Sequence, residues 1–183
     1  MKPTLAELAG KLLVSHPALR HDAFRRTVIF LSAQSQGGPT GIVLNRPTGK
    51  TLGSYAPAFS DGPLNTIPLY TGGPVSPGTL LFCAWGRLPN GGFQIKIGLS
   101  KEQSLHLLSE NNTTMQLRCF RGHASWSPGQ LENELQNNAW VVTRMDSNLL
   151  LTTEGDNLWN ELLAQHHPFL RLLASAPSEI WKN

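Results

Sequence analysis

Residues 79–97 read TLLFCAWGRLPNGGFQIKI, and this stretch decides the fold class. Two apolar segments, 79–85 and 93–97, flank a turn centred on Asn90-Gly91-Gly92, a composition typical of a β-hairpin. In the second segment apolar and polar residues alternate, so one face of that strand meets water. The chain therefore contains an antiparallel strand pair that a purely parallel α/β sheet would not have.

Further elements are expected on both sides of this hairpin. Strands are predicted at 28–31, 41–45, 67–71, 115–119 and 140–145, and helices near 52–56, after Ser100, from Pro128 and around 158–163. The rest of 48–66 has the composition of a loop. Because strands and helices mix without a regular β-α-β alternation, we predict an α+β fold, as a single domain over residues 1–183.

The charge distribution argues against nucleic-acid binding. Fifteen Lys and Arg against twelve Asp and Glu give a net charge of +3, and the longest basic run is the pair Arg25-Arg26. The helix predicted from Pro128 to Asn138 contains two glutamates and no basic residue, so it would read a DNA groove poorly. We therefore expect no direct nucleic-acid partner.

The cysteines and the hydropathy pattern indicate a cytoplasmic protein. Cys83 and Cys119 lie in apolar stretches without Cys-x-x-Cys spacing, which predicts buried, inert thiols and no disulfide or structural zinc site. No stretch approaches the ~18–20 apolar residues of a membrane span, and the N-terminal residues lack the apolar core of a signal peptide. We expect a cytoplasmic location and no membrane partner.

Four segments together resemble the YqgE/AlgH family of bacterial proteins. They are FRRTV at 24–28, preceded by Leu13-Val14 and Pro17; TGIVLNRP at 40–47; YTGGPV at 70–75; and GHASWSPGQLENEL at 122–135, continuing to Asn138-Ala139-Trp140. The order and spacing of the segments also match, and the resemblance covers nearly the whole chain.

The resemblance implies one α+β domain with a mixed, curved β-sheet flanked by helices. Members are often labelled as transcriptional regulators, after one member linked to the regulation of alginate synthesis. No substrate or catalytic residue of the family can be transferred to this chain. Two positions depart from the family pattern: His21 stands where relatives usually have Asp, with the acid displaced to Asp22, and His123 stands where they usually have Tyr.

A small-anion site is the most specific functional hypothesis. Ser127, Pro128 and Gln130 predict a helix that begins at Pro128 with Ser127 as its cap, and free amides at a helix start attract phosphate or carboxylate. We expect Arg25 or Arg26 to turn inward, toward Gly72-Gly73 or toward the segment Trp126-Ser127. The candidate site consists of Arg25, Arg26, Asn45, Arg46, Gly72, Gly73, Trp126, Ser127 and Gln130.

The same residues also have a purely structural interpretation. Glycines occur wherever turns require them, and a Ser-Pro-x-Gln sequence caps helices in proteins of every function. His123 lies close to Ser125 and Ser127, but no Gly-x-Ser-x-Gly elbow is present, and the histidines lack metal-ligand spacing. We therefore predict no catalytic residue, metal or cofactor.

The sequence leaves two functional classes open. The favoured one is a non-catalytic protein that binds a partner protein or a small anionic ligand, with a regulatory role as one option. The alternative is a hydrolase or transferase that acts on a small anionic or phosphorylated substrate held at the Ser127 helix start. A cleft lined by arginine and titratable side chains would favour the enzyme.

Overall fold

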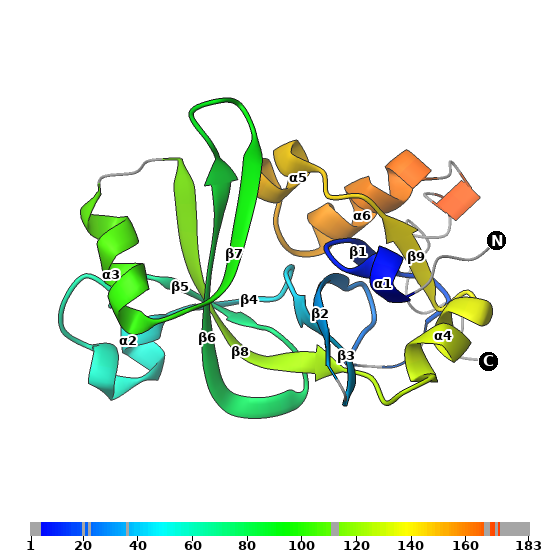
Figure 1. Ribbon diagram of the computed structural model, residues 1–183, viewed down its shortest axis with the longest axis horizontal. Coiled ribbons are helices and arrows are strands. Elements are labelled where there is room, and N and C mark those ends of the chain that lie inside the picture. The colour runs from blue at the N-terminus through cyan, green and yellow to red at the C-terminus, as the bar shows by residue number, and fades with distance from the viewer. Residues whose placement is uncertain are drawn as a thin grey trace.

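The computed structural model describes residues 5–19, 21, 23–35, 37–110, 114–166, 169, 170 and 172, and Figure 1 shows its elements. The strands are β1 (Leu12–Ser15), β2 (Val28–Ser35), β3 (Gly38–Val43), β4 (Pro47–Thr51), β5 (Pro68–Thr71), β6 (Val75–Arg87), β7 (Phe93–Leu99), β8 (Met115–Ser125) and β9 (Trp140–Thr143). The helices are α1 (Leu5–Leu8), α2 (Leu52–Tyr55), η1 (Pro57–Phe59), α3 (Lys101–Ser109), α4 (Gln130–Gln136), α5 (Ser147–Thr152) and α6 (Gly155–His166).

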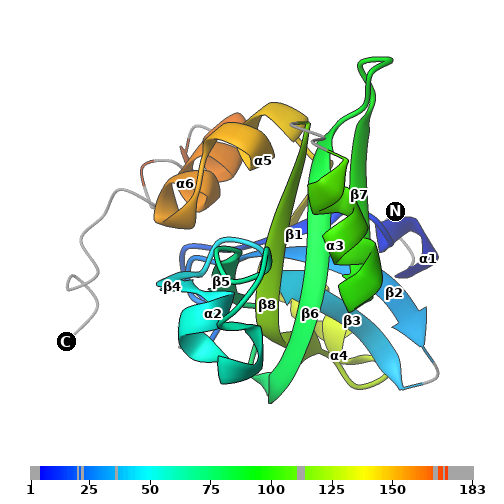
Figure 2. The same cartoon turned by 90° about the vertical axis from the view of Figure 1, so that its left-hand side faces the viewer.

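The strands form one nine-stranded sheet, which is mixed as predicted. Its main path runs β4-β5-β8-β3-β2-β1-β9, and β6 branches from β8 to pair with β7. β5 and β8 run parallel, and the other pairs are antiparallel. Figures 1 and 2 show that the β6-β7 hairpin and β8 run across the direction of β2 and β3, so the sheet is strongly curved.

β8 is long enough to pair with three other strands, and it therefore connects the two parts of the sheet. Its residues 119–121 pair with β5, residues 115–123 pair with β6, and Ala124 and Ser125 pair with β3. Sequence patterning predicted only its first five residues as a strand. The strand continues because Phe120 and Ala124 are fully buried and pack against the core.

Helices cover the sheet on several sides. α5 and α6 place Leu150, Leu158, Trp159, Leu162 and Leu163 on one face, where they pack with Val14, Phe30 and Trp85. On another face Leu131 of α4 packs with Trp126 and Trp140, and Leu52 of α2 joins a third cluster with Leu69 and Phe82. In the described part of the chain, no helix has both the length and the apolar character needed to cross a membrane.

Several elements confirm the sequence patterns, and others were not predicted. The hairpin around Asn90-Gly91-Gly92 is β6-β7, and Ser100 and Gln103 form the reciprocal capping contacts expected at the start of α3. β1, β4 and α5 were missed, since each has only four to six residues and therefore shows little periodicity.

Candidate functional site

The helix that was expected to begin at Pro128 begins two residues later. α4 starts at Gln130, its N-cap is Gly129 in a left-handed conformation (φ 79°), and no side chain caps it. The Gln130 side chain does accept a hydrogen bond from the Ser127 backbone N–H (3.0 Å), as the pattern predicted. The prediction that Ser127 caps the helix was therefore wrong, because residues 127–130 first form a tight turn that Gly129 allows.

Trp126 is structural, because both its ring and its N–H have partners within the protein. The side chain is 1% exposed and lies between the rings of Phe24 (6.3 Å) and Trp140 (6.0 Å). Its indole N–H donates to Glu134 Oε2 (2.9 Å), and the Trp140 N–H donates to the same oxygen (2.6 Å). Its ring is therefore covered by the core and offers no open face on which a ligand could stack.

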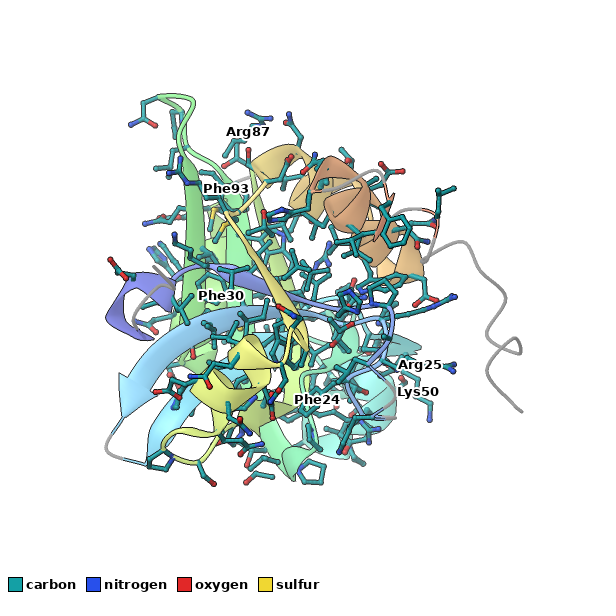
Figure 3. All side chains as sticks on the ribbon, turned by 90° about the vertical axis from the view of Figure 1, so that its right-hand side faces the viewer. Phe24, Arg25, Phe30, Lys50, Arg87 and Phe93 are labelled. Carbon is teal, nitrogen blue, oxygen red and sulfur yellow. The ribbon has the colours of Figure 1, made fainter. Side chains whose placement is uncertain are left out.

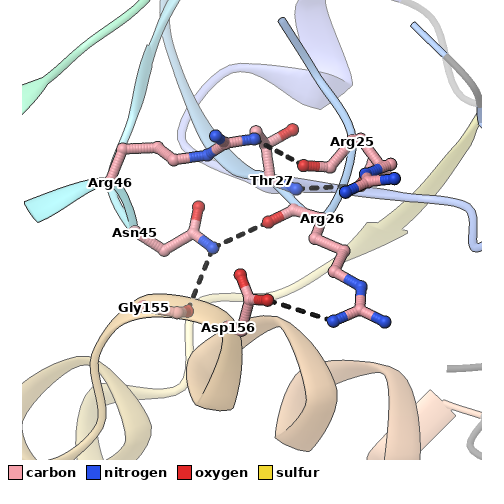
Figure 4. A network of polar contacts seen from close by, with 8 residues as sticks. Arg25, Arg26, Thr27, Asn45, Arg46, Gly155 and Asp156 are labelled. Carbon is pink, nitrogen blue, oxygen red and sulfur yellow. Dashed lines mark hydrogen bonds and ion pairs between the residues drawn. The ribbon is translucent and has the colours of Figure 1, made fainter. Parts of the chain in front are cut away.

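Arg26 clamps α6 to the sheet and does not point toward Gly72 or Ser127. Its Nη1 donates to Asp156 Oδ2 (3.1 Å), and its guanidinium carbon lies 5.4 Å from the centre of the Trp159 ring. Figure 4 shows this ion pair above the first turn of α6. Arg25 is exposed. For Arg26, the expected turn toward Gly72-Gly73 or Trp126-Ser127 was therefore wrong, because a carboxylate on α6 satisfies it instead.

Asn45 makes a second link between the sheet and α6, also drawn in Figure 4. The side chain is 2% exposed, and its Oδ1 accepts the Val28 backbone N–H (2.8 Å). Its Nδ2 donates to the carbonyls of Arg26 (2.9 Å) and Gly155 (3.1 Å). The amide is saturated by the backbone, so its polar atoms serve the fold.

Glu154, the residue before α6, makes a third link between this helix and the sheet. Its Oε1 accepts from the Tyr70 hydroxyl (2.7 Å) and lies 3.0 Å from Arg118 Nη2. Arg118 is 7% exposed and lies over the rings of Tyr70 and Trp85. Burial, followed by the bond to Glu154, raises the pKa of Tyr70, so the phenol stays protonated. The contacts of Glu154 Oε1 with Tyr70 and Arg118 therefore fasten the segment before α6 to the sheet.

Gly72 and Gly73 allow two backbone segments to touch. A Cβ on Gly72 would lie 2.4 Å from the Gly122 carbonyl oxygen, and one on Gly73 would lie 2.2 Å from the His123 carbonyl. The Gly72 N–H donates to Arg121 O (2.8 Å), and its carbonyl accepts from Val43 N (2.8 Å). The glycines are therefore needed for close packing of the sheet.

Two of the predicted residues, Arg46 and Gly73, do line one cleft. The cleft has a volume of about 360 Å³, and its walls include Val43, Arg46, Thr48, Thr71, Gly73 and Pro74. We call it the Arg46 cleft. The other predicted residues lie outside its lining, although the Arg25 carbonyl contacts Arg46.

The guanidinium of Arg46 has spare hydrogen-bonding capacity. Its Nη2 donates to the Arg25 carbonyl (Figure 4), whereas its Nε is buried and has no hydrogen-bond partner in the part of the chain that the structure describes. A guanidinium has five N–H donors, and a buried donor without a partner costs free energy. Nε is too buried for a ligand to reach, so the donors that a ligand in the cleft could use are the remaining Nη hydrogens of Arg46.

Further cations surround the Arg46 cleft, and sequence analysis missed two of them. Arg121 Nε donates to Thr71 Oγ1 (3.4 Å), a hydroxyl of the cleft wall, and Lys50 lies exposed on β4 next to that wall. Figure 3 shows Arg25 and Lys50 projecting from the same side of the molecule. The pairing of β4 with β5 brings Lys50 here, and no local pattern in residues 47–51 predicts this strand.

Among the described residues, the two thiols and the groups that could ligate a metal form no site. Cys83 and Cys119 are buried and unpaired, and burial raises the pKa of each thiol to about 12, as expected for inert cysteines. Among the residues that the structure describes, no cluster of His, Cys, Asp and Glu could hold a metal ion. His21 lies exposed against Phe24, and Asp22 lies outside the described residues.

The comparisons with known proteins identify the family. Residues 12–169 match the family model described as AlgH-like. The chain belongs to the AlgH-like family. This AlgH-like chain is 33% identical to a UPF0301 protein of Streptomyces coelicolor over 96% of its own length and 95% of that protein. It is 30% identical to a UPF0301 protein of Methylococcus capsulatus over 86% of its length and 91% of the relative.

Solved structures share the AlgH-like fold. A protein of Corynebacterium diphtheriae superposes with a TM-score of 0.69 at 22% identity, covering 96% of this chain and 95% of that one. The AlgH protein of Pseudomonas aeruginosa superposes with a TM-score of 0.67 at 23% identity, covering 97% and 98%. These similarities confirm the predicted family and α+β fold class, and the names of these proteins specify no reaction.

Proposed function

We propose that this protein binds a small anion carrying more than one negative charge in the Arg46 cleft, without catalysing a reaction on it. The observation that carries the proposal is the Arg46 guanidinium itself, which lines the cleft and has donors without partners among the described residues. Buried polar groups in native proteins are nearly always paired, so an unpaired arginine donor calls for an explanation. A bound anion would supply acceptors for the remaining Nη hydrogens of this guanidinium.

The charge around the cleft supports an anion over a neutral ligand. Arg121 contacts Thr71 of the cleft wall, Lys50 lies exposed on β4 two residues after Thr48, and Arg25 contacts Arg46 through its carbonyl. The lining residues that the structure describes include no carboxylate. Positive charges that are not neutralised locally attract anions, and several of them favour a ligand with several charges. Pyrophosphate and phosphorylated small molecules have this chemistry.

The lining also supports binding without catalysis. Its described side chains include hydroxyls and a guanidinium but no imidazole, carboxylate or thiol that could transfer a proton or attack a substrate. The Thr48 hydroxyl already donates to the Leu69 carbonyl (2.8 Å) and accepts the Lys50 amide (3.2 Å). The enzyme alternative placed its substrate at Ser127, where the helix is only seven residues long and begins beyond the serine.

A binding experiment with inorganic pyrophosphate tests the proposal. We expect pyrophosphate to raise the melting temperature and to give a saturable calorimetric titration at low salt, whereas monovalent acetate does neither. Arg46→Gln should weaken pyrophosphate binding by roughly 10- to 100-fold, the range expected for one lost hydrogen bond to a charged group. Arg46→Lys should retain part of the affinity, because it keeps the charge.

The control variant is Arg144→Gln, which removes the same charge from an exposed position after β9. It should bind pyrophosphate as the unchanged protein does. Equal loss of binding in both variants would show that only net charge matters, and the Arg46 cleft would then be rejected. Absence of a saturable titration in the unchanged protein would reject the proposal outright.

A further inference from the structure

A second cavity lies on the other face of the sheet, and the Arg46 cleft does not account for it. Its volume is about 280 Å³, and its lining includes Ser32, Ile42, Thr79, Leu81, Ile97 and His123. We call it the His123 cavity. Ile42 lines this cavity whereas its neighbour Val43 lines the Arg46 cleft, and successive residues of a strand face opposite sides.

Three irregularities of strand pairing meet around the His123 cavity. Between β2 and β3 the extra residue is Ser32, between β6 and β7 it is Gly98, and between β6 and β8 the pairing is interrupted across 76–79. Each interruption supplies or adjoins a lining residue: Ser32, Ile97 and Thr79 respectively. Bulges bend strands and redirect side chains, and they are frequent next to binding sites. The cavity is therefore produced by the way the sheet is built.

The lining has one polar group that stands out. The His123 side chain is partly buried, and its imidazole makes no hydrogen bond with any residue for which the structure gives a position. Ser32 Oγ already bonds to the Thr40 carbonyl (3.2 Å), and Thr79, the other hydroxyl residue named in this lining, is exposed to solvent. The imidazole is thus the group on this wall best placed to recognise a ligand, since one of its ring nitrogens can donate and the other can accept.

The other lining side chains determine what kind of molecule fits. Ile42, Leu81 and Ile97 form an apolar surface, and no lysine, arginine, aspartate or glutamate is found among the described lining residues. A cavity of about 150 Å³ lined by apolar side chains is enough to bind benzene, so this one has room for a ring with a short substituent. An ionised ligand would lose hydration here without gaining a charged partner.

We propose that the His123 cavity binds a small uncharged molecule with a ring-sized apolar body and one hydroxyl group, which hydrogen-bonds to the His123 imidazole. The body lies on Ile42, Leu81 and Ile97, and the hydroxyl faces His123. This site is independent of the Arg46 cleft, because the touching backbones of Gly73 and His123 separate the two. Either site can be refuted without affecting the other.

The test is an amide-detected NMR titration with two probes that differ by one hydroxyl, p-cresol and toluene. We expect both to shift the amide signals of residues 32, 79, 97 and 123, and p-cresol to bind roughly 2- to 10-fold more tightly, the factor that one net hydrogen bond supplies. His123→Leu should remove this preference while leaving toluene binding unchanged. His123→Gln, which keeps a donor and an acceptor, should restore part of it.

Two controls make the result decisive. Ile97→Trp should fill the cavity and abolish binding of both probes, and Arg46→Gln should leave both unaffected. If neither probe shifts these amides, or if both still bind with unchanged affinity after Ile97→Trp, the cavity is not the binding site. If p-cresol keeps its preference in His123→Leu, the role given to the imidazole is wrong.

Discussion

Replacing Asn45 with alanine tests how the sheet is fastened to α6. The substitution leaves the buried Val28 N–H without its acceptor and the carbonyls of Arg26 and Gly155 without their donor. An unsatisfied buried donor costs about 1–3 kcal/mol, and each lost ordinary hydrogen bond about 0.5–1.5 kcal/mol. Water entering the space left by the amide would recover part of this loss. We expect Asn45→Ala to lower the free energy of unfolding by about 2–4 kcal/mol.

The assay is urea unfolding followed by tryptophan fluorescence, together with amide hydrogen exchange at Val28. For a chain of this size such a loss lowers the melting temperature by roughly 5–15 °C. Exchange at Val28 should accelerate more than exchange in β6, because the lost acceptor is local. The matched control is Asn157→Ala, an exposed asparagine of α6 whose side chain makes no hydrogen bond to any described residue, and it should stay within about 0.5 kcal/mol of the unchanged protein.

The reasoning would be refuted if Asn45→Ala were as stable as Asn157→Ala. It would also be refuted if Asn45→Ala lost pyrophosphate binding while keeping full stability. Asn45 would then be a ligand residue, as the sequence first indicated, and the backbone contacts drawn in Figure 4 would contribute little to stability.

Three further predictions test other parts of the structure. Gly73→Ala should destabilise the protein by at least ~2 kcal/mol in thermal unfolding, since its Cβ would overlap the His123 carbonyl, whereas Gly78→Ala, with open space around it, should be nearly neutral. Ser127→Ala should change the free energy of unfolding by less than ~0.5 kcal/mol, because the hydroxyl does not cap α4. Gln130→Ala should lower it by ~1 kcal/mol, because its side chain loses hydrogen bonds to Ser127 and Glu134. A larger loss for Ser127→Ala than for Gln130→Ala would show that Ser127 is the cap. Cys83 and Cys119 should not react with a thiol reagent at pH 8 until urea unfolds the chain, because burial raises the pKa of each to about 12 and keeps the protonated form; fast reaction in the native protein would contradict this.

Local patterns predicted those elements whose signals lie close together in the sequence. The β6-β7 hairpin follows from a glycine-rich turn between two apolar runs, and the start of α3 follows from a serine and a glutamine three residues apart. β4 could not be predicted in this way. Its residues PTGKT have no apolar periodicity, and they form a strand only because Pro47 and Thr51 pair with β5.

The candidate site was predicted only in part, for the same reason. The sequence places Arg25, Arg26 and Arg46 near strand ends, but it does not show that Asp156, 130 residues further along, takes Arg26. Arg26 pairs with Asp156 of α6, and Arg46 is the one of the three arginines that lines the cleft. Arg121 and Lys50 lie next to the cleft because of strand pairings that no local sequence pattern reveals. Long-range pairing therefore decided which of the predicted arginines remained available.

The position of β1 has a consequence for synthesis of the chain on the ribosome. Of the nine described strands β1 is made first, yet it lies between β2 and β9, and Leu13 pairs with Val142. At about 5–20 residues per second, the ribosome needs roughly 6–26 s to add the intervening 130 or so residues. During that time the edge of β1 that later pairs with β9 is open. The Ser15 carbonyl, which later accepts a hydrogen bond from the Trp159 indole N–H, has no partner from the C-terminal part either. The nascent chain therefore carries an open apolar strand edge, to which a chaperone or a neighbouring nascent chain could bind, until β9 emerges.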